Sequence, residues 1–228
     1  MPQETYRWVI VAAGGLLGCM AIGSMFTLPV LIRPIVENTG WSVTGISTAM
    51  TIAFVAMALG SMAFGSLSDH IGARPVVLMG SGALAASLAW ASRATSMLEF
   101  QLIFGLVVGL SIAAILPPLM ASVMGWFDTH RSLAVSLVSA GMGMAPMTVS
   151  PFAAWLVSNY DWRFSLLAIA GLAAITMIPL ALLIRRPPAL PEEERSPMPT
   201  TGARAPMSVG AALTSSPFIV LMLTNFFC

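Results

Sequence analysis

Charged residues are scarce in this sequence: Asp, Glu, Lys and Arg make up only 8% of its 228 residues, and none of them is lysine. A soluble globular domain carries about 25% charged residues, so this composition excludes an ordinary soluble domain. The formal net charge is +1, which gives no sign of the basic surface typical of nucleic-acid-binding proteins. We therefore expect no nucleic-acid partner.

Cysteine and histidine are also rare. Cys19 lies in an apolar run and Cys228 at the last position, so no disulfide framework is predicted. His70, His130 and every aspartate lie outside the apolar runs. Intramembrane hydrolases need a serine with a histidine, or paired aspartates, inside their helices, so the sequence predicts that this protein is not an enzyme. We also expect no metal site and no cofactor.

Long apolar runs dominate what is present, because 57% of the residues are hydrophobic and the mean hydropathy is +0.89. A membrane-spanning helix needs about 20 apolar residues. Six runs come close to that length or exceed it: 8–32, 44–67, 75–92, 98–125, 132–157 and 163–184. We therefore expect an all-α membrane protein embedded in a lipid bilayer, with a six-helix transmembrane bundle over residues 1–184.

The end of the sequence has a different composition. Residues 185–216 contain Arg-Arg-Pro-Pro, Pro-Glu-Glu-Glu-Arg and further Pro, Thr and Ser. Such a segment cannot bury a core, so we expect a flexible linker. An apolar run then begins at Pro217 and stops at Cys228. Because its helix would rise only about 18 Å across a hydrocarbon core about 30 Å thick, we expect 217–228 to be the truncated start of a seventh helix.

The arginines predict an orientation. With a cytoplasmic N-terminus, seven arginines fall on the inner side and three on the outer side, as the positive-inside rule requires. The inner set is Arg7, Arg74, Arg131, Arg185, Arg186, Arg195 and Arg204, and the outer set is Arg33, Arg93 and Arg163. The use of arginine without lysine is typical of a GC-rich bacterial genome. We therefore expect a bacterial inner-membrane protein whose N-terminus and linker are cytoplasmic.

The polar segment at 65–74 reads Gly-Ser-Leu-Ser-Asp-His-Ile-Gly-Ala-Arg and separates the second and third runs. Its charges must lie at a membrane surface, because the bilayer core cannot solvate them. A solvated polar turn would explain the charges alone. A more specific interpretation is a conformational switch, in which Gly65 lets another helix pass closely and Asp69 faces the positive end of a helix. Gly72 then permits the turn, and Arg74 supplies a countercharge.

This segment resembles the motif G-x-L-x-D-[RK]-x-G-[RK]-[RK] between the second and third helices of the major facilitator superfamily. The matching residues are Gly65, Leu67, Asp69, Gly72 and Arg74, whereas His70 and Ala73 depart from the motif. The resemblance implies the N-terminal half of a 6+6 transporter, built as a 3+3 inverted repeat. It also implies that the motif stabilises the outward-facing state against a missing C-terminal six-helix half.

A looser resemblance covers residues 125–171, which are similar to the fifth-helix region of monocarboxylate carriers and oxalate/formate antiporters. The shared features are an aromatic pair at 126–127, Arg131 before Leu-Ala, Ala-Gly at 140–141 and Trp-Arg at 162–163. Generic helix packing would also explain the glycines and prolines here. The resemblance implies a symporter or antiporter that moves a small organic anion, a mono- or dicarboxylate, by alternating access.

The resemblance further implies that helices 1, 4 and 5 face the substrate pathway. The candidate pathway residues are Phe26, Thr27, Pro117, Met142 and Pro146. They would define the shape of the pathway, because no charged side chain falls deep within a run. Pro117-Pro118 would either interrupt the fourth helix beside a cavity or only kink it near its cytoplasmic end. A carrier of neutral solutes such as sugars remains an alternative, as does a drug exporter, although no arginine lies between Arg93 and Arg131.

Overall fold

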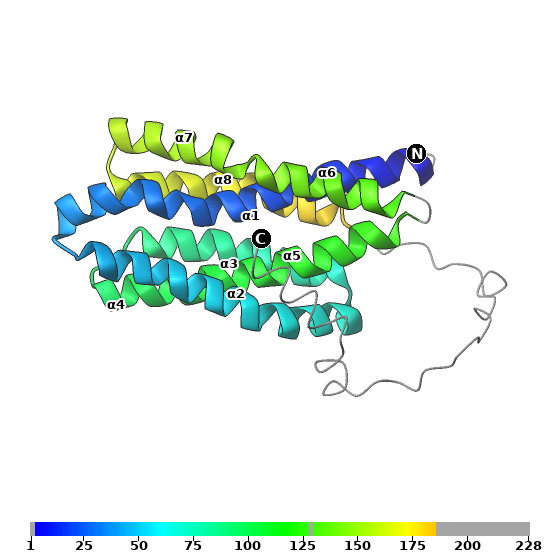
Figure 1. The fold of residues 1–228 in the computed structure, drawn as a ribbon, viewed down its shortest axis with the longest axis horizontal. Coiled ribbons are helices and arrows are strands. Elements are labelled where there is room, and N and C mark those ends of the chain that lie inside the picture. Colours follow the sequence, from blue (N-terminus) through cyan, green and yellow to red (C-terminus); the bar gives the residue numbers. More distant parts are fainter. Residues whose placement is uncertain (1–2, 128–129, 186–228) are drawn as a thin grey trace, which may run out of the picture. The chain divides into compact units, whose positions relative to one another are not determined.

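A computed structural model describes residues 3–127 and 130–185, and every regular element in these ranges is helical (Figure 1). They belong to one compact unit, Met1–Pro188. The elements are α1 (Gln3–Thr39), α2 (Val43–Ile71), α3 (Ala73–Ala91), α4 (Met97–Phe100), the π-helix η1 (Gln101–Val107), α5 (Val108–Gly125), α6 (Arg131–Gly143), α7 (Ala145–Asn159) and α8 (Trp162–Leu182). The predicted linker, apart from Arg185, and the predicted seventh helix lie outside the described residues.

These elements form six lengthwise crossings, as the six apolar runs predicted. The first three crossings are α1, α2 and α3, the fourth is α4–η1–α5, the fifth is α6–α7 and the sixth is α8. Within the described residues, five crossings are long and apolar enough to span a membrane. The exception is α3, which has 19 residues and contains Arg74. The expected all-α six-helix fold is confirmed.

Helix boundaries differ from the predicted runs where polar residues extend a helix beyond its apolar part. α1 continues through Pro29 and Pro34 to Thr39, seven residues past the predicted end. The Arg33 Nε lies 2.8 Å from a carboxylate oxygen of Glu37 on this extension, and such an i,i+4 pair supports a helix. Hydropathy detects the part of a helix that is apolar rather than the part that is helical.

The fourth crossing contains a seven-residue π-helix, η1, that the sequence did not predict. The Gln101 amide at its start donates a hydrogen bond of 2.7 Å to the Gly45 carbonyl on α2. Of the two readings of Pro117-Pro118, the interruption is wrong, since α5 runs unbroken from Val108 to Gly125. A kink within the continuous helix stays a prediction. Each of the two prolines still removes one backbone donor from α5, which favours a kink there.

The fifth crossing is broken in the middle. α6 ends at Gly143 and α7 begins at Ala145, with Met144 between them. Pro146 occupies the first turn of α7, where its missing N–H leaves no hydrogen bond unmade within that helix. The break in the fifth crossing therefore lies between Gly143, which ends α6, and Pro146, which lies in the first turn of α7.

The packing of the crossings repeats itself. The first crossing packs against the fifth and sixth, and the fourth packs against the second and third. The third and sixth pack against each other. Exchanging crossings 1, 2 and 3 with 4, 5 and 6 reproduces these pairs, which is the relation expected within a 3+3 repeat.

Glycines bring the backbones together in both halves of this repeat. A Cβ atom on Gly141 would lie 2.8 Å from the Gly15 Cα, between the fifth and first crossings. A Cβ atom on Gly109 would lie 2.9 Å from the Ala53 Cα, between the fourth and second crossings. Membrane helices associate through such close packing of small residues.

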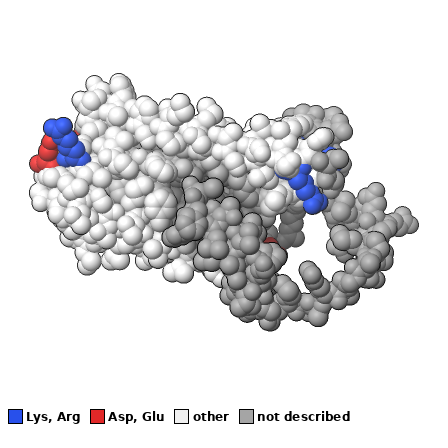
Figure 2. Space-filling model, viewed as in Figure 1, with Lys and Arg blue, Asp and Glu red and all other residues white. Residues whose placement is uncertain are grey.

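Charged residues lie at the two ends of the bundle. In the face that Figure 2 shows, blue and red side chains lie at one end and blue side chains lie toward the other, and the described surface between them is mostly white. Aromatic side chains gather near the same ends. Trp41, Phe100 and Trp162 contact one another at one end, and Tyr6 contacts Trp126 at the other. Phe100, Trp126 and Trp162 are buried, so these contacts pack the helix ends together. The exposed Trp8, Trp90 and Trp155 lie near helix ends, as interfacial tryptophans do.

Arg163 fastens the sixth crossing to the third. Its guanidinium donates hydrogen bonds of 2.8 Å and 3.0 Å to the carbonyls of Ser92 and Ala94, just beyond α3. It also lies 4.4 Å from the centre of the Trp162 ring. The Trp162 indole in turn donates to the Asn38 side chain on α1 at 3.3 Å. One end of the bundle thus has a cross-linked layer of polar contacts.

Candidate functional site

The switch motif forms a tighter turn than its sequence indicated. α2 extends to Ile71 and α3 starts at Ala73, so Gly72 alone connects them. Gly72 has φ +95° and ψ 156°, a conformation essentially reserved for glycine. Its N–H donates to the Ser68 carbonyl at 2.8 Å. The structure thus gives a physical reason for glycine at this motif position.

Asp69 lies in the last turn of α2 rather than in a loop, which corrects the predicted boundary at residue 67. The C-terminal end of a helix carries partial negative charge, so a carboxylate there is not favoured by its own helix. Among the described residues, Asp69 makes no ion pair and no hydrogen bond. Beside Gly65, no described atom lies within 4 Å of where a Cβ would be.

A hollow of about 350 Å³ lies beside this turn, at the end of the bundle that carries Arg185. It is lined by Ser68, Asp69, His70, Gly72, Ala73, Arg74, Ala121, Ser122 and Arg185. The Ser122 hydroxyl is buried and has no hydrogen-bond partner among the described residues. The motif residues Asp69, Gly72 and Arg74 therefore meet in one polar recess, whereas Gly65 does not line it.

The five candidate pathway residues lie on the first, fourth and fifth crossings. Thr27 is fully buried, and its hydroxyl donates to the Gly23 carbonyl of its own helix at 3.0 Å. The Phe26 carbonyl on α1 accepts a hydrogen bond from Ser150 on α7. Met142 packs where a Cβ on Gly18 would lie. These contacts place the three residues at, or close to, the packing of the first crossing against the fifth.

The two prolines lie on different crossings. Pro117 is half-buried within α5, in the fourth crossing, and Pro146 is exposed at the start of α7, in the fifth. Neither residue lines the 350 Å³ hollow described above. A pathway between these crossings would have no charged lining residue among the five candidates.

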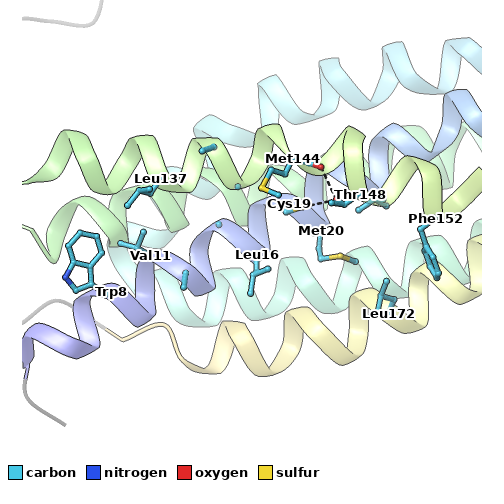
Figure 3. Close-up of a pocket in the computed structure, with 15 residues that line it drawn as sticks. Trp8, Val11, Leu16, Cys19, Met20, Leu137, Met144, Thr148, Phe152 and Leu172 are labelled. Atoms are coloured by element: carbon cyan, nitrogen blue, oxygen red, sulfur yellow. Dashed lines mark hydrogen bonds between the residues drawn. The ribbon is translucent and has the colours of Figure 1, made fainter.

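A large cavity on the side of the bundle was not predicted. It is an apolar groove of about 750 Å³, here called the lateral groove, walled by α1, α6–α7 and α8 (Figure 3). Its lining residues are Trp8, Val11, Ala12, Gly15, Leu16, Cys19, Met20, Leu137, Ala140, Gly141, Met144, Thr148, Val149, Phe152 and Leu172. None of the five candidate pathway residues is among them. The sequence did contain a signal for this groove, namely small residues at helical spacing. They are Ala12 and Gly15 on α1, opposite Ala140 and Gly141 on α6.

No cofactor site is evident in the part of the chain that the structure describes. Within residues 3–127 and 130–185, no three side chains of the metal-binding types His, Cys, Asp and Glu lie together. The arrangement of apolar helices, a charged turn at one end and a broken crossing suits movement of a solute across a membrane better than covalent chemistry.

The Major Facilitator Superfamily profile matches residues 14–228. The chain belongs to this superfamily. Its members are transporters, so the prediction that the chain is not an enzyme is confirmed. Curated relatives include monocarboxylate transporter 13 of Rattus norvegicus, with 27% identity over 99% of this chain and 52% of that protein. Monocarboxylate transporter 3 of the same organism is 29% identical over 99% of this chain and 46% of its own length.

A third relative, monocarboxylate transporter 11 of Mus musculus, is 27% identical over 81% of this chain and 41% of its own length. The chain thus spans about half the length of the curated relatives it matches. This superfamily member has six crossings, which fits one half of a 6+6 architecture. The predicted likeness to monocarboxylate carriers is confirmed at the level of sequence similarity.

Proposed function

We propose that this chain forms the N-terminal half of a secondary transporter that moves a small monocarboxylate by alternating access. The observation that carries the proposal is its similarity to several monocarboxylate transporters along most or all of its length. Orientation belongs to the same proposal: the N-terminus and the end with Arg7, Arg74, Arg131 and Arg185 face the cytoplasm. The bacterial inner membrane remains a prediction from composition, since the relatives named above are mammalian.

The distribution of charge supports different roles for the two halves of the transporter. Ser24 and Thr27, the buried polar side chains at the middle of α1, donate to carbonyls of their own helix. No described arginine lies within the central part of a crossing to pair with a carboxylate. This half would then supply the shape of the pathway, with Phe26, Thr27, Pro117, Met142 and Pro146 as contacts. The second half would supply the group that binds the anion.

Transport can be measured on a protein that contains this chain together with a complete second six-helix half. Proteoliposomes should take up labelled lactate, formate or oxalate faster than empty liposomes do, and unlabelled anion should compete. An imposed proton gradient and an exchangeable internal anion separate symport from antiport. Uptake of a neutral sugar or of a lipophilic drug, with none of these anions, would favour the alternatives of a sugar carrier or a drug exporter.

A second prediction concerns the switch motif of Gly65, Asp69, Gly72 and Arg74. Asp69→Asn should keep membrane insertion and expression but change the balance between inward- and outward-facing states. The reason is that the carboxylate has no partner among the described residues and would face a helix terminus of the second half. Such a contact is worth about 0.3–1 kcal/mol when exposed, which is roughly a two- to fivefold change in a two-state ratio.

The state ratio can be measured by single-molecule fluorescence between labels on the two halves. His70→Gln is the matched control, because His70 lines the same hollow but carries no carboxylate. An Asp69→Asn protein with the wild-type state ratio and transport rate would show that the motif is only a solvated turn.

A further inference from the structure

The lateral groove has the length of one membrane leaflet. It runs along α1 from Trp8 to Met20, and twelve helical steps rise about 18 Å. Half of a hydrocarbon core about 30 Å thick is about 15 Å. Trp8 contacts the Phe127 ring near one end of the bundle, where tryptophan marks the membrane–water interface. The groove therefore starts near a headgroup region and, lined on α7 as far as Phe152, reaches at least to the bilayer midplane.

The walls of the groove are apolar and open to the side. Leu16 and Met144 are 55% and 56% exposed, and Figure 3 shows them on α1 and between α6 and α7. The thiol and hydroxyl in the groove satisfy each other, since Cys19 Sγ lies 3.6 Å from Thr148 Oγ1. The Thr148 hydroxyl also reaches the Met144 carbonyl at 2.9 Å. With its hydroxyl and thiol already paired, the groove suits an aliphatic chain better than water.

Positive charge lies at the end of the groove that Trp8 occupies. Phe127, which contacts Trp8, accepts a hydrogen bond of 2.7 Å from Arg131 Nε through its carbonyl. Arg7 precedes Trp8, and its Nε is enclosed without a hydrogen-bond partner among the described residues. Arginines at the membrane surface attract the phosphates of anionic lipids. The groove thus combines a leaflet-length apolar channel with a cationic entrance.

We infer that the lateral groove is a binding site for one anionic phospholipid, with an acyl chain between α1, α6–α7 and α8 and its phosphate near Arg7 and Arg131. The acyl chain of the lipid would cover the small residues Ala12, Gly15 and Ala140, whose short side chains leave the surface hollow. The inference is independent of the transported substrate, because the groove contains none of the candidate pathway residues. It predicts a lipid that stays with the protein when the bulk bilayer is removed.

Native mass spectrometry of the chain, extracted from nanodiscs containing equal phosphatidylglycerol and phosphatidylcholine, tests this site. One phosphatidylglycerol per chain should be retained in preference to phosphatidylcholine. Ala140→Phe should fill the groove and lower retention roughly tenfold, equivalent to 1.4 kcal/mol. Ala12→Phe fills the same groove from α1 and replaces Ala140→Phe in this test if that variant misfolds. Ala86→Phe is the matched control, because Ala86 is exposed on α3 outside the groove.

Arg131→Gln should reduce the preference for phosphatidylglycerol over phosphatidylcholine while leaving some lipid bound. Equal retention by Ala140→Phe, Ala12→Phe and the Ala86→Phe control would overturn the site, and equal retention of both lipids by the unaltered chain would overturn the role of the arginines. Loss of the lipid on addition of a second six-helix half would assign the groove to that half instead. None of these results bears on transport, which has its own assay.

Discussion

Replacing Gly109 by alanine should severely destabilise the bundle. The new Cβ would lie 2.9 Å from the Ala53 Cα and closer still to the Ala53 carbonyl oxygen, both backbone atoms of α2. Backbone atoms cannot rotate out of the way, so α5 and α2 would have to separate along their contact. Overpacking of a tight contact typically costs about 1–3 kcal/mol and occasionally more. We expect Gly109→Ala to fall at or above the top of that range.

Gly171→Ala is the matched control for this measurement. Gly171 also lies inside a helix, but no atom of the described residues lies within 4 Å of where its Cβ would be. Alanine is favoured over glycine in a helix interior by about 0.8–1 kcal/mol, so Gly171→Ala should be neutral or stabilising. Unfolding of the chain in mixed micelles, followed by circular dichroism as SDS is added, gives both free energies. Similar values for the two variants would contradict the close packing of α5 on α2.

Gly72→Ala should also destabilise the chain, for a conformational rather than a packing reason. Gly72 has φ +95° and ψ 156°, and a side chain there costs on the order of 1–3 kcal/mol. Because Gly72 is the single residue between α2 and α3, no neighbouring loop residue can absorb the change. The expected outcome is a lower free energy of unfolding and a changed angle between the two helices.

The same SDS titration measures this effect, and Gly82→Ala in α3 is its control. Gly82 is helical, and the part of the chain that the structure describes leaves open space where a Cβ would be, so its replacement keeps the backbone unstrained. Distances between spin labels at exposed positions on α2 and α3 report the angle. A Gly72→Ala protein as stable as Gly82→Ala, with unchanged distances, would argue against the strained turn.

The sequence predicted the features that depend on which residues are apolar. The six runs located the six crossings, and residues 65–74 pointed to the family because glycines and charges at fixed spacing report a specific turn. Features that depend on hydrogen-bond register were missed. Nothing in Gln101–Val107 distinguishes a π-helix from an α-helix, since both bury the same kind of side chain. At Pro117-Pro118 the sequence left open whether the helix is interrupted or only kinked, because the loss of two backbone donors does not by itself decide between them.

The candidate site was predicted less completely than the fold. Gly72 and Arg74 could be placed at one turn because they are close in the sequence. The lateral groove arises from Ala12, Gly15 and Ala140, which are far apart in the sequence and meet only when α6 crosses α1. A hollow is the absence of side chains at a particular crossing, and no single sequence segment encodes it. Crossing geometry, rather than composition, decides where such space is left.

The contacts of Arg163 have a mechanical consequence. The two carbonyls that it binds follow α3, the last helix of the first repeat, while Arg163 itself lies in the first turn of α8, the last helix of the second repeat. Sliding one repeat past the other would break two hydrogen bonds from a charged donor, each worth about 1.5–3 kcal/mol. The described bundle should therefore move as one rigid body. Conformational change would then be concentrated where this bundle contacts another helical domain.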